Sequence, residues 1–147
     1  MNKLLLSLVV LILSFNAVSQ LKIIEEVKKE QIGIIKTSGI NWFECTKYED
    51  ESYLFTYRNW KYQTIFEYES FRIKGNQTLN ELYEVLISTL TKKEKKNVDI
   101  DLGNGETLSL RFAGKKTMEF WVWNGSSWSY SCPMNIKGVN MLWGKTK

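Results

Sequence analysis

The sequence predicts an α+β fold: an antiparallel sheet of about seven or eight short strands, one main helix packed on it, and a short C-terminal helix. Segments that alternate apolar and polar residues fill both halves of the chain, as expected for half-buried strands. The turns between them are short, which favours hairpins and therefore antiparallel pairing. A stretch of helical periodicity separates the two β-rich halves.

The first half of the chain is expected to form four strands, over residues 31–36, 40–48, 52–58 and 62–73. The third is the clearest, because Tyr53, Phe55 and Tyr57 fall on one face and alternate with the residues of the other. Gly39 and Asn59 favour turns, since both residue types tolerate the left-handed backbone that turns require.

The main helix is expected over residues 78–92. Thr78 and Glu81 have the spacing of a capping box, in which the two side chains satisfy the first free amides of a helix. The apolar positions fall on one helical face, which we expect to face the core: Leu79, Leu82, Tyr83, Leu86 and Leu90.

The second half is expected to form four more strands, over residues 98–102, 108–112, 117–123 and 128–132. Asn-Gly pairs at 104–105 and 124–125 favour hairpin turns between successive strands. A short closing helix is expected over residues 135–143, because its apolar residues recur with helical spacing.

The N-terminus has the features of a signal peptide over residues 1–19, followed by a single exported domain over 20–147. Asn2 and Lys3 give a polar, positive start, the run 4–15 is almost entirely apolar, and small residues precede the cleavage point. This run is shorter than the roughly 20 residues of a membrane span, which disfavours an uncleaved anchor. We therefore expect a bacterial protein of the periplasm or extracellular space, without a transmembrane span after cleavage.

The charge of the chain is mildly positive. It has 20 basic and 16 acidic residues and a net charge of +4, and loss of Lys3 with the signal peptide leaves 19 basic residues and a charge of +3. This excess is too small to predict nucleic-acid binding, and export argues against that function independently.

The two cysteines, Cys45 and Cys132, predict one disulfide, because a small, even number of cysteines in an oxidising compartment tends to pair. The bridge closes a loop of about 90 residues and contributes up to roughly 4–5 kcal/mol in the chain-entropy model. The alternative is a pair of buried free thiols.

The chain contains no histidine. That excludes Ser-His and Cys-His nucleophile pairs and the common zinc sites, and two cysteines cannot complete a Cys-only zinc site. We expect no cofactor and no metal. Carboxylate catalysis of the glycosidase type stays open, because it needs only two suitably separated acids. Its candidate residues are Glu44, Glu67, Glu69, Glu81, Asp99, Asp101, Glu106 and Glu119.

The hairpin over residues 117–132 carries the side chains that suggest a function. A loop of either two or four residues places five residues on one face: Trp121, Trp123, Trp128, Tyr130 and Cys132. The other face then carries Met118, Phe120, Val122, Ser127, Ser129 and Ser131.

Two interpretations of the tryptophan side of this hairpin compete. We favour a core position, because cysteine is often buried and an exposed group of tryptophans invites aggregation; the serines then mark the wet side. The alternative is a platform on which sugar rings stack, with Glu119 at its end. Among the other indoles, Trp60 is expected to be the most exposed, because it lies in a turn between polar neighbours.

Together these observations favour a small exported domain that acts as a non-enzymatic binding or interaction protein of the bacterial envelope. Its expected partner is an unknown envelope protein or a glycan. The alternative is a carbohydrate-binding module that uses Trp121, Trp123, Trp128 and Tyr130, with Glu119. A carboxylate-based glycosidase is a third hypothesis, with less support.

Overall fold

The computed structural model describes residues 27–92, 95–103 and 105–146, which form two four-stranded sheets and two helices. The predicted signal peptide over residues 1–19 lies outside the described residues. None of the helices in the described ranges is long and apolar enough to cross a bilayer.

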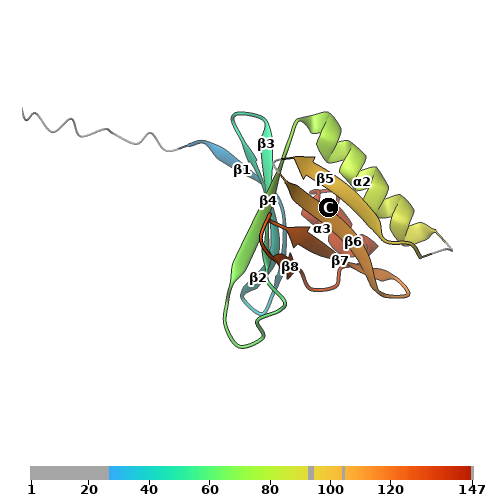
Figure 1. Ribbon diagram of the computed structural model, residues 1–147. Helices are drawn as coiled ribbons and strands as arrows, with labels where there is room; N and C mark the ends of the chain where they lie inside the picture. The colour runs from blue at the N-terminus through green and yellow to red at the C-terminus, as the bar shows by residue number, and fades with distance from the viewer. Residues whose placement is uncertain (1–26, 93–94, 104, 147) are drawn as a thin grey trace, which may run out of the picture.

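The first sheet is antiparallel, with its strands in chain order (Figure 1). Its strands are β1 (Lys29–Thr37), β2 (Ile40–Tyr48), β3 (Ser52–Arg58) and β4 (Tyr68–Lys74). The predicted alternation in β3 is confirmed, since Tyr53, Phe55 and Tyr57 are all buried.

The second sheet repeats this up-and-down arrangement with the second half of the chain. Its strands are β5 (Val98–Gly103), β6 (Glu106–Gly114), β7 (Thr117–Trp123) and β8 (Trp128–Tyr130). The predicted α+β class, with about seven or eight antiparallel strands, one main helix and a short C-terminal helix, is confirmed, and the eight strands form two sheets where the sequence analysis expected one.

The fourth strand is shorter than predicted. It begins at Tyr68, whereas the sequence predicted a strand from residue 62. The intervening residues form a loop that closes on itself: the Asn59 N–H donates to the carbonyl of Glu67 at 2.8 Å, and the Gln63 amide donates to the carbonyl of Trp60 at 2.7 Å. These bonds satisfy backbone groups that a longer strand pair otherwise uses.

The main helix, α2 (Asn76–Thr91), begins two residues before the predicted start. Gly75 precedes it with a φ of 88°, so the chain turns from β4 directly into the helix, and no side chain caps the first amides. The predicted capping box is therefore wrong, because Thr78 already lies inside the first turn. The Glu81 carboxylate instead accepts a bond from the Gln77 side chain at 2.9 Å.

The apolar face of α2 packs on the core, as the sequence predicted. Its buried residues are Leu79, Leu82, Leu86, Thr89 and Leu90. The second helix, α3 (Ile136–Leu142), is capped by the preceding Asn135, whose side chain accepts a bond from the Gly138 N–H at 3.0 Å. The Trp143 indole, directly after α3, donates to the carbonyl of Leu79 at 3.1 Å and ties the two helices together.

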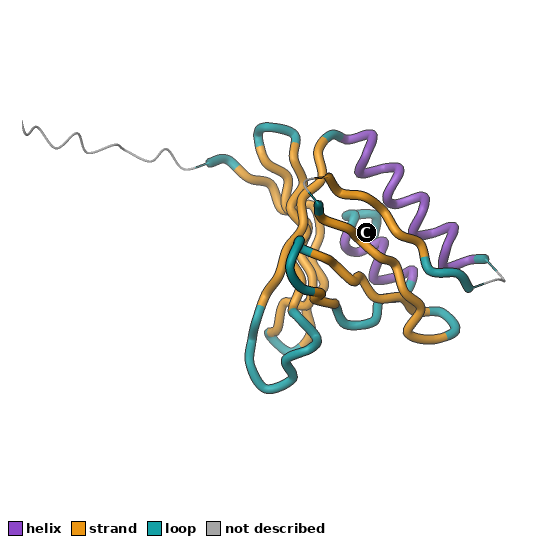
Figure 2. The backbone as a smooth tube through the Cα atoms, in the orientation of Figure 1, coloured by secondary structure: helices purple, strands orange, loops and turns teal. Residues whose placement is uncertain are grey.

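The core lies where the two sheets and the helices meet. Figure 2 shows the first sheet on one side of the molecule and α2 on the opposite side, and the second sheet crosses the view from one to the other, so that a single face of it meets both. The ring centroid of Phe120 in β7 lies 5.6 Å from that of Phe43 and 5.9 Å from that of Phe71, both of which belong to the first sheet. Phe55 lies 5.1 Å from the Trp143 ring, so aromatic contacts join every layer.

Gly33 in β1 is the point where α3 touches the first sheet most closely. A Cβ atom added at this residue would lie 2.2 Å from the carbonyl oxygen of Met141 and 2.3 Å from that of Leu142. We expect Gly33→Ala to lower the free energy of unfolding by about 2–3 kcal/mol, because the helix backbone must move away. Urea unfolding measures this loss.

The matched control is Gly114→Ala, where the nearest atom is the Thr117 hydroxyl at 3.0 Å. This change is expected to cost less than about 1 kcal/mol, because a side chain can shift where a helix backbone cannot. Equal losses for the two variants contradict the close contact between α3 and β1.

Candidate functional site

The hairpin of β7 and β8 has a four-residue loop, one of the two registers that the sequence allowed. Trp123 pairs with Trp128, and Trp121 pairs with Tyr130. The Asn124 side chain fixes the loop, because its Oδ1 accepts the N–H groups two and three residues further on at 3.0 and 2.9 Å. The four aromatic side chains therefore lie on one face of the second sheet, as predicted.

That face is the outer one, so the expectation that it forms the core is wrong. The intervening side chains of Met118, Phe120 and Val122 are at most 2% exposed and face the first sheet. Trp128 is 38% exposed, and the other three aromatic side chains are half-buried. The tryptophans of the hairpin are therefore accessible to solvent.

Of the three serines expected on the wet side, Ser127 is exposed in the loop, whereas Ser129 and Ser131 are buried, and each of these two has a polar partner. The Ser129 hydroxyl lies 2.7 Å from the Tyr57 hydroxyl of the first sheet. The Ser131 hydroxyl accepts the Phe120 N–H at 2.9 Å and donates to the carbonyl of Cys132 at 3.0 Å. Burial raises the pKa of Tyr57 far above its usual value, so its hydroxyl stays protonated.

The aromatic face comprises Trp121, Trp123, Trp128 and Tyr130, with Arg111 and Glu119 beside them. The Trp121 and Tyr130 rings are stacked, with centroids 4.5 Å apart and planes 11° apart. The Trp123 and Trp128 rings lie 5.5 Å apart and are tilted by 48°. Both pairs are cross-strand neighbours, an arrangement that stabilises antiparallel sheets.

Arg111 of β6 connects the two aromatic pairs. Its guanidinium lies 4.4 Å from the Trp121 ring centroid and 5.4 Å from that of Trp128, both within cation–π range. Glu119 lies at the end of the face, as predicted, and its carboxylate accepts the Trp121 indole N–H at 2.9 Å. Arg111 and Tyr130 come from the strands on either side of β7, so Trp121 is held between two neighbours.

A shallow depression of about 290 Å³ lies on the aromatic face. It is lined by Asp99, Thr107, Arg111, Trp123 and Trp128. The depression thus places a carboxylate, a hydroxyl and a guanidinium beside two indole rings. These are groups that bind polar ligands with an apolar face.

The predicted carboxylates do not converge on this depression. Of the candidates, Asp99 lines the depression and Glu119 lies at the end of the same face. Three others lie on or next to the first sheet: Glu44, Glu67 and Glu69. The remaining three lie around a groove beside α2: Glu81, Asp101 and Glu106. Burial, with the charge of Glu67, raises the pKa of Glu69. No cluster of metal-ligating side chains occurs among the residues that the structure describes.

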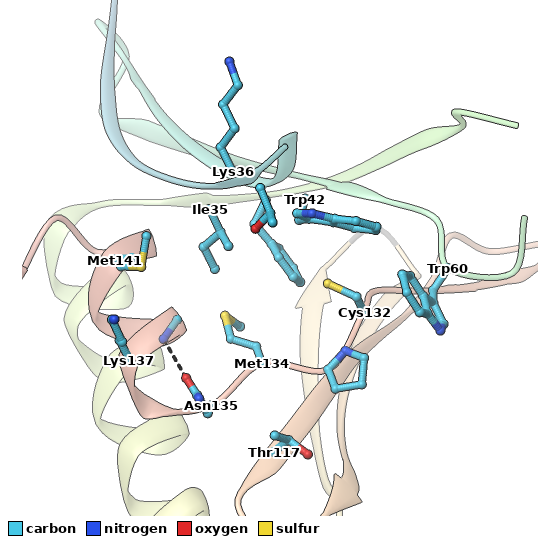
Figure 3. Close-up of a pocket in the computed structure, with 14 residues that line it drawn as sticks. Ile35, Lys36, Trp42, Trp60, Thr117, Cys132, Met134, Asn135, Lys137 and Met141 are labelled. Carbon is cyan, nitrogen blue, oxygen red and sulfur yellow. Dashed lines mark hydrogen bonds between the residues drawn. The ribbon is translucent and has the colours of Figure 1, made fainter. Parts of the chain in front are cut away.

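The sequence did not indicate a second concave region, a pocket of about 500 Å³ between α3 and the end of the first sheet (Figure 3). Trp42 and Trp60 line it, with ring centroids 5.3 Å apart. The expectation that Trp60 is an exposed indole is wrong, because its side chain is half-buried against Trp42. The paired tryptophans come from β2 and from the loop after β3, which are distant in sequence.

The cysteines expected to form a disulfide are free thiols in the structure. Cys45 is buried in β2, and Cys132 follows β8 and lines the second pocket. Burial raises the pKa of Cys45 to about 12 and that of Cys132 to about 11. A disulfide in the oxidised protein stays a prediction. It was inferred from export to an oxidising compartment, and that inference does not depend on the distance between the two cysteines.

Comparison of the chain with protein-family models, with curated proteins and with solved structures finds no match.

Two indoles at opposite extremes of burial are expected to respond differently to substitution. Trp128→Phe should remove easily quenched fluorescence and cost less than about 1 kcal/mol, because it loses partly exposed ring contacts. Trp143→Phe should remove a shielded component and cost about 2 kcal/mol, because it loses a buried hydrogen bond and core volume. Acrylamide quenching and urea unfolding measure both effects, and similar losses of stability contradict the outward orientation of the aromatic face.

The two thiols are expected to be poor nucleophiles in the reduced protein. With a pKa of about 11, Cys132 is roughly one part in a thousand thiolate at pH 8, so its alkylation should accelerate about ten-fold per pH unit from pH 7 to 9. Cys45 should react more slowly still. Iodoacetamide labelling read by mass spectrometry tests this, with Cys45→Ala to isolate Cys132; labelling that levels off near pH 8 contradicts a raised pKa.

Proposed function

We propose that the protein is an exported, non-enzymatic binding protein of the bacterial envelope that contacts a protein partner through the aromatic face. The observation that carries the proposal is the outward orientation of three tryptophans and a tyrosine around Arg111. Tryptophan, tyrosine and arginine are the residue types that contribute most to protein–protein binding.

The order of the aromatic face supports a preformed contact surface. Arg111 bridges Trp121 and Trp128, and Glu119 fixes the Trp121 indole by a hydrogen bond. Side chains already held in one arrangement lose little conformational entropy on binding, so more of the contact energy becomes affinity. The central strand β7 is hydrogen-bonded to β6 on one side and to β8 on the other, which keeps the face rigid.

A glycan is the second candidate ligand, favoured by the depression between Trp123 and Trp128. Asp99 and Thr107 supply polar atoms there that can bond sugar hydroxyls. A broad sugar platform is disfavoured, because the Trp121 ring already stacks with Tyr130 and packs beneath Arg111 and so does not offer a free flat surface. A glycosidase has less support, because Asp99 is the one candidate acid that lines this depression.

Photo-cross-linking in intact cells tests the protein partner. A benzophenone side chain in place of Trp128 should form a discrete adduct, and the same side chain in place of Ile65, which is 53% exposed on the first sheet's loop, should not. Arg111→Ala should weaken binding to the captured partner about thirty-fold, the effect of losing a central contact residue. Identical adducts from both positions, or none, contradict the proposal.

Titration with soluble glycans separates the second candidate. Sugar binding in the depression should shift tryptophan emission, and Trp128→Phe should abolish the shift. A protein-binding face gives no glycan-dependent change.

A further inference from the structure

The pocket beside α3 is separate from the aromatic face. Its walls come from β1, β2, the loop after β3, the start of β7 at Thr117 and the segment from Cys132 to Met141, and none of the residues of the aromatic face lines it. An inference about this pocket therefore does not depend on the function proposed above.

The interior of the pocket is apolar. Figure 3 shows Ile35 and Trp42 on one side facing Met134 and Cys132 on the other. Methionine side chains are flexible and polarisable, so Met134 and Met141 adapt to ligands of different shape. The volume of about 500 Å³ lies within the range of small-molecule sites in proteins.

The charged residues that line the pocket are basic. Its fourteen lining residues, all within the described ranges, include two lysines, Lys36 and Lys137, and no carboxylate. The buried Arg58 guanidinium does not line the pocket but lies 4.9 Å from the Trp42 ring centroid, and its Nε finds no hydrogen-bond partner among the described residues. The high pKa of Cys132 keeps this thiol neutral near pH 7, so the walls add no negative charge.

We propose that this pocket binds a single-chain amphiphilic anion of the fatty-acid type, with its hydrocarbon chain against the indoles and methionines and its charged head at the lysines. Lysine suits such a margin, because its stem packs on apolar surface while its ammonium stays in water. Figure 3 shows the Lys36 side chain directed away from the apolar centre, so its ammonium lies in solvent at the margin of the pocket. A ligand of the opposite charge meets repulsion from both lysines.

Fluorescence titration with cis-parinaric acid, a fatty acid whose emission rises in apolar surroundings, tests the proposal on the mature protein. Saturable binding at one site per chain is expected, and the uncharged methyl ester should bind several-fold more weakly. Trp60→Ser should weaken binding roughly ten-fold, which corresponds to about 55 Å² of lost apolar contact. Trp128→Ser is the matched control on the other sheet and should leave the affinity unchanged.

The charge is tested separately by Lys36→Glu with Lys137→Glu, two exposed positions at which folding should be unaffected. The double variant should bind the acid about five- to ten-fold more weakly, an effect that shrinks in high salt. Lys28→Glu with Lys74→Glu makes the same change of net charge at exposed positions near the opposite end of the first sheet and should have no effect.

Three outcomes overturn the proposal. The first is absence of saturable binding by a protein whose thermal unfolding shows that it is folded. The second is equal affinity for acid and ester, which leaves an apolar site without selection for an anion. The third is equal weakening by Trp60→Ser and Trp128→Ser, which places the probe elsewhere. None of these results bears on cross-linking at the aromatic face, so the two proposals fail independently.

Discussion

The position of Phe120 between the two sheets sets the orientation of the whole second sheet. Its ring packs edge-on against Phe43 and close to Phe71, both fully or almost fully buried. Because side chains alternate along a strand, an inward Phe120 places Trp121 and Trp123 on the opposite face. A slip of one residue in β7 exchanges the two faces, so the same packing that stabilises the core also exposes the candidate site.

Local patterns predicted most of the fold. Alternation located the strands and helical periodicity located α2, because both signals lie within a few neighbouring residues. Two local signals failed for structural reasons. Thr78 and Glu81 have capping-box spacing, yet Gly75 starts the helix earlier, at a point fixed by where β4 ends. Residues 62–67 belong to a loop whose hydrogen bonds join its own two ends.

The membership of the aromatic face was predictable, but its direction was not. Which side of β7 faces inward depends on Phe43, Phe71 and Tyr57, which lie far away in sequence and form the opposing wall. Serine hydroxyls are read as solvent-facing, yet Ser129 is buried because Tyr57 supplies a partner across the core. The pocket beside α3 was not predictable for the same reason, since its walls come from five separate segments.

The short strand β8 has a consequence for how other molecules approach the aromatic face. The unpaired N–H and C=O groups of an exposed edge strand can pair with a strand of another chain, which promotes aggregation. Here the edge is only three residues long, and the Trp60 N–H occupies the carbonyl of Tyr130 at 2.7 Å. Strand addition is thus blocked next to the tryptophans. A partner that binds at the β8 edge therefore contacts side chains and not unpaired backbone. The identity of these side chains then determines which partner binds, and single substitutions can change that selectivity.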